Sequence, residues 1–142
     1  MFAIRAGRPG MATFTFYIGA EVIQLTEMPD AIAALPRDDR GYPVPWFVAW
    51  VGGKPEFRCA DSAKFARAVK QKRCWICGEQ LDPRQHVFVI GPMCMVNRIT
   101  SEPPCHESCA IFSVRNCSFL TRPAAQYRAA NLPAESEQPP SL

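Results

Sequence analysis

The sequence predicts a small α+β domain with a short antiparallel sheet and two helices. Short runs rich in β-branched and aromatic residues indicate strands at 46–51 (WFVAWV) and 86–90 (HVFVI). Helical spacing of apolar residues after Asp61, and a pair of prolines at 103–104, indicate where the two helices begin. Fourteen prolines in 142 residues keep every element short, and this length suits a single domain.

We expect this domain to span residues 13–122, between a flexible leader at 1–12 and a disordered tail at 123–142. The leader is rich in glycine and proline. The tail consists largely of Ala, Pro, Glu, Ser and Gln, which cannot bury a core. The chain has no run of about 18 apolar residues that could cross a membrane, and its N-terminus lacks the apolar stretch of an export signal. We therefore expect a cytoplasmic protein without a membrane partner.

The N-terminal part of the chain predicts strands and then a helical turn. Residues 13–26 alternate and are rich in strand-forming types, which predicts two short strands joined at residues 19–20. Residues 30–35 predict one helical turn. Pro36 ends it, because the residue before a proline disfavours the helical conformation.

A β-hairpin is predicted next. Residues 46–51 are expected to form a buried strand, and Gly52 with Gly53 supplies the turn. Residues 55–58 return as an edge strand, because Pro55 cannot donate a hydrogen bond to a ladder.

The following helix is predicted to carry a basic face. Asp61 or Ser62 is its expected N-cap, and it runs to residue 73. The apolar face expected to pack on the sheet comprises Phe65, Ala66 and Val69. The outward basic face comprises Lys64, Arg67 and Lys70. Such a stripe meets either solvent or a phosphate-bearing partner.

Cysteine and histidine residues form two pairs with the same internal spacing. Cys74 and Cys77 enclose two residues, and His106 with Cys109 repeats that spacing after a gap of 28 residues. Three thiolates and one imidazole make the tetrahedral set of a structural zinc ion. Gly78 suits the tight turn after the first pair, because backbone amides there face the sulfurs. Strand 86–90, a loop at 93–104 and a helix from the prolines to about residue 116 complete a treble-clef-like order.

The spacing leaves two other cysteines as competing ligands. Cys105 could replace His106, since it lies four residues before Cys109, and Cys94 is the next substitute. We favour His106 because a two-residue gap is the commoner spacing of a second pair. Four protein ligands leave no position for water, which argues for a structural metal. Seven cysteines are an odd number, so complete disulfide pairing within one chain is excluded.

The sequence resembles small zinc-finger-like proteins of actinobacteria and their phages over about residues 36–123. The motifs that carry the resemblance are DRGYPVPWFV at 39–48, CWICG at 74–78, GPMC at 91–94, EPPCH at 102–106, and Cys109. Ser118 departs from the Cys-Pro-Phe-Leu that such proteins carry after the helix. The resemblance implies a bacterial or phage origin and brings no activity with it.

These observations favour a zinc module that binds nucleic acid or a host protein over an enzyme. The predicted phosphate contacts are Lys64, Arg67, Lys70 and Arg98. The alternative is a His-Asn-His-type metal-dependent endonuclease that uses His86, Asn97 and His106. A thiol-redox role is less favoured, because a redox pair opens a helix whereas Cys74 follows one.

Overall fold

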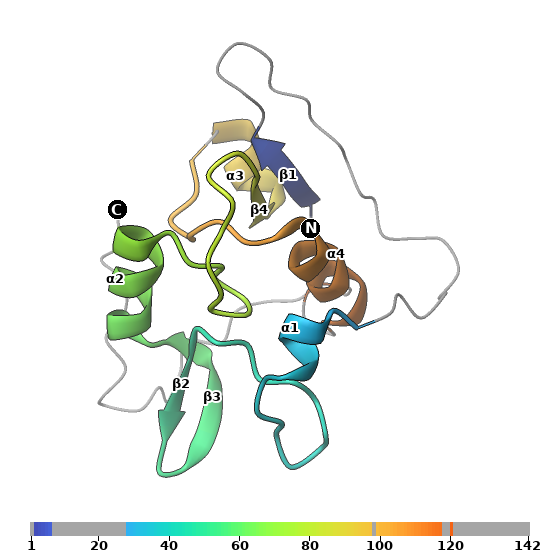
Figure 1. Ribbon diagram of the computed structural model, residues 1–142. Coiled ribbons are helices and arrows are strands. Elements are labelled where there is room, and N and C mark those ends of the chain that lie inside the picture. The colour runs from blue at the N-terminus through green and yellow to red at the C-terminus, as the bar shows by residue number, and fades with distance from the viewer. Residues whose placement is uncertain (1, 7–27, 98, 118–119, 121–142) are drawn as a thin grey trace.

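The computed structural model describes residues 2–6, 28–97, 99–117 and 120, which form a mixed α+β fold (Figure 1). The elements in chain order are β1 (Phe2–Ala6), α1 (Asp30–Ala33), β2 (Val48–Val51), β3 (Lys54–Ala60), α2 (Ser62–Gln71), β4 (His86–Ile90), α3 (Pro92–Asn97) and α4 (Glu107–Asn116). The strands predicted within residues 13–26 and the predicted tail at 123–142 lie outside the described residues. No helix among the described residues combines the length and the apolar character needed to cross a bilayer.

Two separate two-stranded antiparallel sheets make up the β structure. Strand β1 pairs with β4 from Phe2 opposite Ile90 to Ala6 opposite His86, and β2 pairs with β3. Residues 2–6 were expected to belong to a flexible leader, but they form strand β1. Its partner lies far away in the sequence, so the local composition that suggested a leader carries no sign of the pairing.

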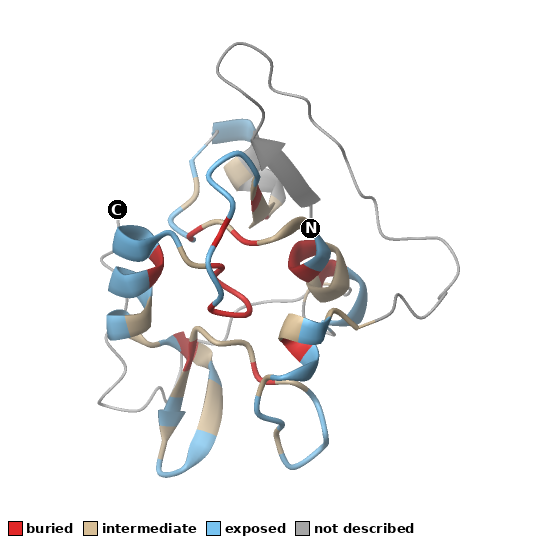
Figure 2. Cartoon of the chain, in the orientation of Figure 1, coloured by how far each residue is buried: buried red, intermediate tan, exposed pale blue. Residues whose placement is uncertain are grey.

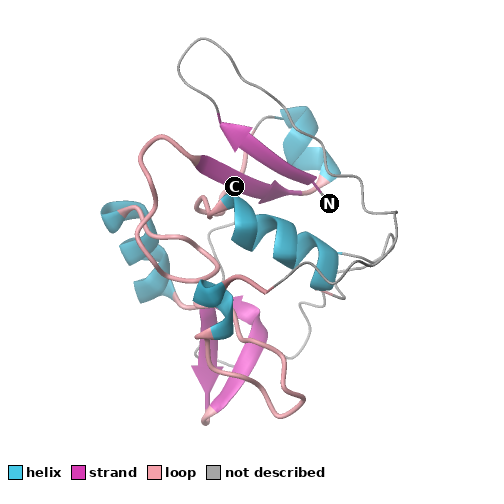
Figure 3. Cartoon of the chain, turned by 45° about the vertical axis from the view of Figure 1, so that its right-hand side comes forward, coloured by secondary structure: helices cyan, strands magenta, loops and turns pink. Residues whose placement is uncertain are grey.

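The two sheets lie at opposite ends of the molecule in both ribbon views (Figures 1 and 3). Helix α4 packs against β1 and β4, while the β2–β3 hairpin lies at the other end. The buried residues gather between them, mainly in the irregular segments around 74–81 and 103–105 and in α4 (Figure 2). The buried cluster comprises Ile32, Cys74, Ile76, Cys77, Leu81, Val87, Cys105, Cys109 and Ala110. The core is thus built around cysteines more than around large aliphatic side chains.

The predicted β2–β3 hairpin is confirmed, with one correction. Gly52 and Gly53 both have positive φ, at 57° and 77°, as the tightest hairpin turns require. Val48 is fully buried, but Trp50 is 42% exposed, so the expectation of a buried strand is wrong at that position. A register shift after Val48 gives the hairpin an irregular base, and the hairpin's outer part extends away from the core.

Helix α2 begins as predicted but buries a different face. The Asp61 carboxylate caps it by accepting a hydrogen bond from the backbone N–H of Lys64 at 2.9 Å. Ala68 is the buried residue of this fully described helix, whereas Phe65 and Val69 are 39% and 57% exposed. The prediction that these two side chains pack on the sheet is wrong. The helix lies beside the cysteine-bearing turn, where a small residue fits closely and Phe65 makes only an edge contact with the Trp75 ring.

Helix α3 occupies part of the segment that was predicted as a loop. Pro92 is the first residue of this helix. A proline suits the first helical position, because its fixed φ is helical and its missing N–H has no partner there. Strand β4 spans His86–Ile90 and α4 ends at Asn116, as predicted. The predicted start of this helix at the prolines is wrong, because α4 begins at Glu107 and the segment before it bridges to β4 through Cys105.

A close contact between Trp46 and Gly78 joins the loop before β2 to the cysteine-bearing turn. The backbone N–H of Trp46 donates to the Ile76 carbonyl at 2.7 Å. Its ring then covers Gly78 so closely that a Cβ there would lie 2.6 Å from Trp46 Cγ. Gly78 also has φ 79°, in the left-handed region that other residues avoid. Both the backbone conformation and the space therefore require glycine.

We predict that Gly78→Ala lowers the free energy of unfolding by about 2–5 kcal/mol, the sum of left-handed strain and forced displacement of the Trp46 ring. Gly53→Ala is the matched control, because it has φ 77° with nothing within 4 Å of the added Cβ, and it should cost only about 1–2 kcal/mol. Denaturant titration of the two variants measures the difference. Equal losses would show that the Trp46 contact contributes nothing.

Candidate metal centre

The first cysteine pair is held by a tight turn that the backbone builds itself. The N–H of Cys74 donates to the Glu79 carbonyl at 2.7 Å, and the N–H of Gly78 donates to the Cys74 carbonyl at 2.8 Å. Positive φ at Gly78 lets the chain reverse within these bonds. The reversal carries Cys74 and Cys77 on one side of the turn, as the predicted knuckle requires.

The second pair is brought to the first by an extended segment that bonds on two sides. Cys105 exchanges both backbone hydrogen bonds with Val87 of β4, at 2.7 and 3.2 Å, and the Pro104 carbonyl accepts from the N–H of Trp75 at 3.0 Å. This segment therefore ties β4 to the knuckle. His106 follows as the N-cap of α4, and Cys109 lies in the first turn of that helix.

The four predicted ligands converge on one point. One ligand atom from each of Cys74, Cys77, His106 and Cys109 lies within 4.8 Å of the other three. The sulfur of Cys77 is 3.4 Å from His106 Nδ1, and the sulfur of Cys109 is 4.0 Å from it. A tetrahedral zinc ion with ligands at about 2.0–2.3 Å holds them about 3.5–3.8 Å apart. The group can therefore hold one metal ion with little rearrangement.

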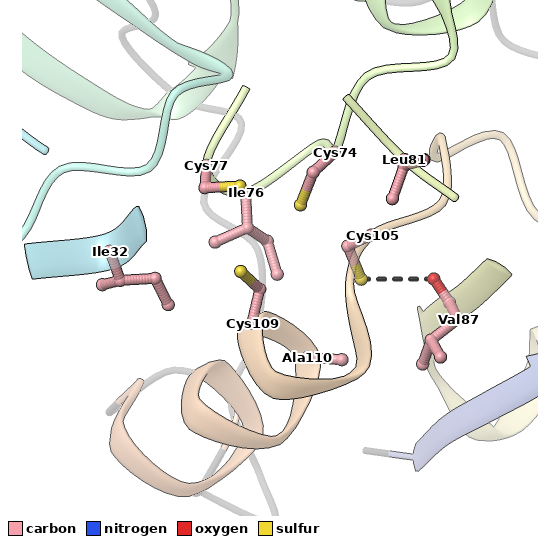
Figure 4. Packing of buried hydrophobic residues seen from close by; sticks show 9 residues of the cluster. All are labelled: Ile32, Cys74, Ile76, Cys77, Leu81, Val87, Cys105, Cys109 and Ala110. Atoms are coloured by element: carbon pink, nitrogen blue, oxygen red, sulfur yellow. Dashed lines mark hydrogen bonds between the residues drawn. The ribbon is translucent and has the colours of Figure 1, made fainter. Parts of the chain in front are cut away.

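Cys105 is excluded as a ligand by the direction of its thiol. Figure 4 shows the sulfurs of Cys74, Cys77 and Cys109 pointing toward one another, whereas the Cys105 sulfur points the other way. Its S–H donates to the Val87 carbonyl at 3.2 Å. Burial raises the pKa of the Cys105 thiol, which keeps it protonated as that bond needs. Cys94, the other competing ligand, is not in the group that the described residues form.

The His106 ring is oriented by a backbone carbonyl. Its Nε2 lies 3.1 Å from the Gln80 carbonyl oxygen. A carbonyl only accepts, so Nε2 carries the hydrogen, and in a neutral ring Nδ1 then offers its lone pair to the cluster. Metal-binding histidines commonly receive such a partner, which fixes the tautomer and makes the ligand atom more basic. This contact is not visible in the sequence, because any residue at position 80 supplies the same carbonyl.

Hydrogen bonds among the three thiols shift their pKa values in different directions. The Cys109 and Cys77 thiols both donate to Cys74, which lowers the pKa of Cys74 to about 2. The backbone N–H of His106 also donates to this sulfur, at 3.4 Å. The same bond to Cys74 raises the pKa of Cys109. A hydrogen bond with Cys109 lowers the pKa of Cys77, but the bond with Cys74 and burial outweigh it and raise that pKa to about 11. Ionisation is therefore favoured at Cys74 and disfavoured at Cys77 and Cys109, so a bound cation would help the cluster to carry further negative charge.

The predicted phosphate contacts are not equivalent in the structure. The Lys64 ammonium donates to the Val48 carbonyl at 3.0 Å and lies 3.9 Å from the Asp61 carboxylate, so it joins α2 to the hairpin. The Arg67 guanidinium lies over the Trp46 ring, 5.5 Å from its centroid. Lys70 is exposed on the same helix, and Arg98 lies outside the described residues.

The residues of the nuclease alternative lie in different settings, although His86 and His106 flank the antiparallel bridge between Val87 and Cys105. Within the described ranges His86 Nε2 is buried and has no hydrogen-bond partner. Asn97 is exposed on α3, and His106 belongs to the thiol cluster. A general base must reach a water beside the substrate, which a buried ring nitrogen cannot do.

Comparison of the chain with models of known protein families, with curated proteins and with solved structures finds no match. Its function is therefore inferred from the site and the surface around it.

We predict that the purified protein holds one tightly bound divalent metal ion per chain, and that Cys109→Ser loses it. Cys105→Ser is the matched control, because the hydroxyl can make the same hydrogen bond to Val87 while all four cluster members remain. Elemental analysis with native mass spectrometry gives the stoichiometry. Metal retained by Cys109→Ser and lost by Cys105→Ser would reverse the ligand assignment.

We also predict that the metal-loaded protein keeps His106 as the tautomer with the hydrogen on Nε2. The long-range ¹H–¹⁵N correlation spectrum should show a protonated Nε2 and a metal-bound Nδ1. His106→Cys should retain the metal, since it restores a fourth ligand, whereas His106→Ala should bind it much more weakly. A protonated Nδ1 in the loaded protein would contradict the assignment.

Proposed function

We propose that the metal is a structural zinc ion and that the protein is a zinc-stabilised binding module. The single observation that carries this proposal is the closed set of three sulfurs and one imidazole nitrogen, with all three sulfurs buried. Sulfur-rich tetrahedral sets select zinc over harder cations. A set of four protein ligands leaves no open position for substrate, which distinguishes structural from catalytic zinc.

Zinc would add folding free energy to a core that is built from small side chains. Among the described residues, the largest fully buried side chains are of modest size, namely Ile32, Leu81, Val44, Val48, Cys74 and Cys109. Small domains with so little apolar burial commonly rely on a metal for their folding free energy. The order of knuckle, strand β4 and helix start supports the treble-clef assignment. Unpaired cysteines suit a reducing compartment such as the cytoplasm.

We propose nucleic acid as the partner, on the basis of how charge is divided along the chain. Residues 47–73, which include the β2–β3 hairpin and α2, hold seven Lys and Arg against two Asp and Glu. The other residues hold nine against eleven. The positive charge of the protein thus belongs to one continuous unit, and a polyanion is the partner that such a unit favours.

Within this unit three side chains of α2 and its C-cap are exposed for phosphate contacts, namely Arg67, Lys70 and Lys72. Arg67 is held by its stacking on Trp46, and a stacked guanidinium still has its N–H edges available for a phosphate. Lys64 is better assigned to the fold, because its ammonium already bonds to β2. The nuclease alternative is less supported, since His86 Nε2 is buried.

We predict that replacing Arg67, Lys70 and Lys72 together by Ala weakens nucleic-acid binding and lowers the salt slope. Each lost phosphate contact should reduce the slope of log K against log salt by about 0.7–0.9. Fluorescence anisotropy with a labelled oligonucleotide at several salt concentrations measures both quantities.

The control for charge alone is Arg84→Ala, which removes an exposed cation outside the basic unit and should leave the slope unchanged. Lys64→Ala should lower the melting temperature more than the affinity. Wild-type protein that holds zinc and binds no oligonucleotide at low salt would exclude a nucleic-acid partner.

A further inference from the structure

We propose that the partner is single-stranded nucleic acid and that Trp50 and Phe57, on the β2–β3 hairpin, stack against its bases. This inference rests on the proposed function and narrows it to one class of ligand. It starts from two large aromatic side chains that the fold leaves exposed, Trp50 at 42% and Phe57 at 43%. Trp75, by contrast, is 5% exposed in the same protein.

Both aromatic residues lie on one face of the hairpin. Trp50 pairs with Pro55 across the two strands, so these two side chains share a face. Phe57 lies two residues beyond Pro55, where the register of the hairpin begins to shift. The side chains on either side of it, Glu56 and Arg58, bond to each other at 2.7 Å and so share one face. This leaves Phe57 on the face of Pro55, opposite the ion pair. The hairpin therefore separates an aromatic face from a charged one.

The hairpin that carries the aromatic face is joined to α2, the helix that carries the basic side chains. The N–H of Asp61, the N-cap of α2, donates to the Phe47 carbonyl at 2.8 Å, and Lys64 bonds to the Val48 carbonyl at 3.0 Å. These bonds hold the helix against the base of the hairpin. Lys54 is exposed at the hairpin turn, so cations lie at both ends of the aromatic pair.

Exposed aromatic rings within a basic unit favour an unpaired strand over a duplex. In a duplex each base already stacks on its neighbours, and only its edges are accessible in the grooves. Unpaired bases present free faces, and aromatic side chains stack on them with little preference for sequence. Diagonal neighbours across two strands lie about 7–8 Å apart, a separation that an extended single strand can span between neighbouring bases.

Fluorescence titration tests the inference, with single-stranded and duplex oligonucleotides of equal length and the zinc-loaded protein. The single strand should quench the exposed Trp50, and it should bind more tightly than the duplex at the same salt concentration. Trp50→Ala and Phe57→Ala should each weaken single-strand binding by about 5- to 100-fold. Neither change should alter the salt slope, because no phosphate contact is removed.

Conservative variants separate stacking from general apolar contact. Trp50→Phe should keep most of the affinity while abolishing the quench. Phe57→Leu keeps apolar area but removes the ring, so it should weaken binding nearly as much as Phe57→Ala. Single-strand affinity that is unchanged in Trp50→Ala and Phe57→Ala would overturn the stacking inference and leave the proposed function intact. No binding of either oligonucleotide would instead remove the proposed function.

Discussion

The convergence of four ligands on one metal position is the constraint on which the rest of the structure depends. It joins a turn at 74–78 to the start of α4, two segments that are far apart in the sequence. Everything with a regular shape is attached to one of these two segments. Strand β4 is bonded to the second through Cys105, and α2 runs directly into the first. A two-stranded sheet is at best marginally stable alone, so each of the two sheets depends on packing against the segments that carry these ligands.

The knuckle also organises the surface away from the metal. Trp46 lies on Gly78, Arg67 lies on Trp46, and the Arg73 guanidinium donates to the Gly78 carbonyl at 3.0 Å. The turn that carries Cys74 and Cys77 thus also positions two cations, Arg67 and Arg73. A change at Gly78 is therefore expected to affect both the buried cysteine cluster and the basic surface.

The sequence predicts best what short-range chemistry fixes. The ligands follow from Cys and His spacing, the hairpin turn from Gly52 and Gly53, and the start of α2 from Asp61. Prediction from the sequence fails where tertiary packing decides the structure. Helical spacing identifies Phe65 and Val69 as one face but not which side of the helix meets the core. The pairing of β1 with β4, and the Gln80 carbonyl behind His106, have no local signal because backbone groups make them.

The thiol network has a consequence for how protons and metal exchange. Before a metal enters, the lowered pKa of Cys74 favours its thiolate, the raised pKa values of Cys77 and Cys109 favour their thiols, and His106 Nδ1 lies 3.4 Å from the Cys77 sulfur. A divalent ion that enters displaces the two remaining thiol hydrogens. Two positive charges arrive and two leave, so the formal charge of the centre stays the same. Metal binding therefore does not change the charge that the neighbouring surface meets. Low pH opposes metal binding through the return of two protons and not of three.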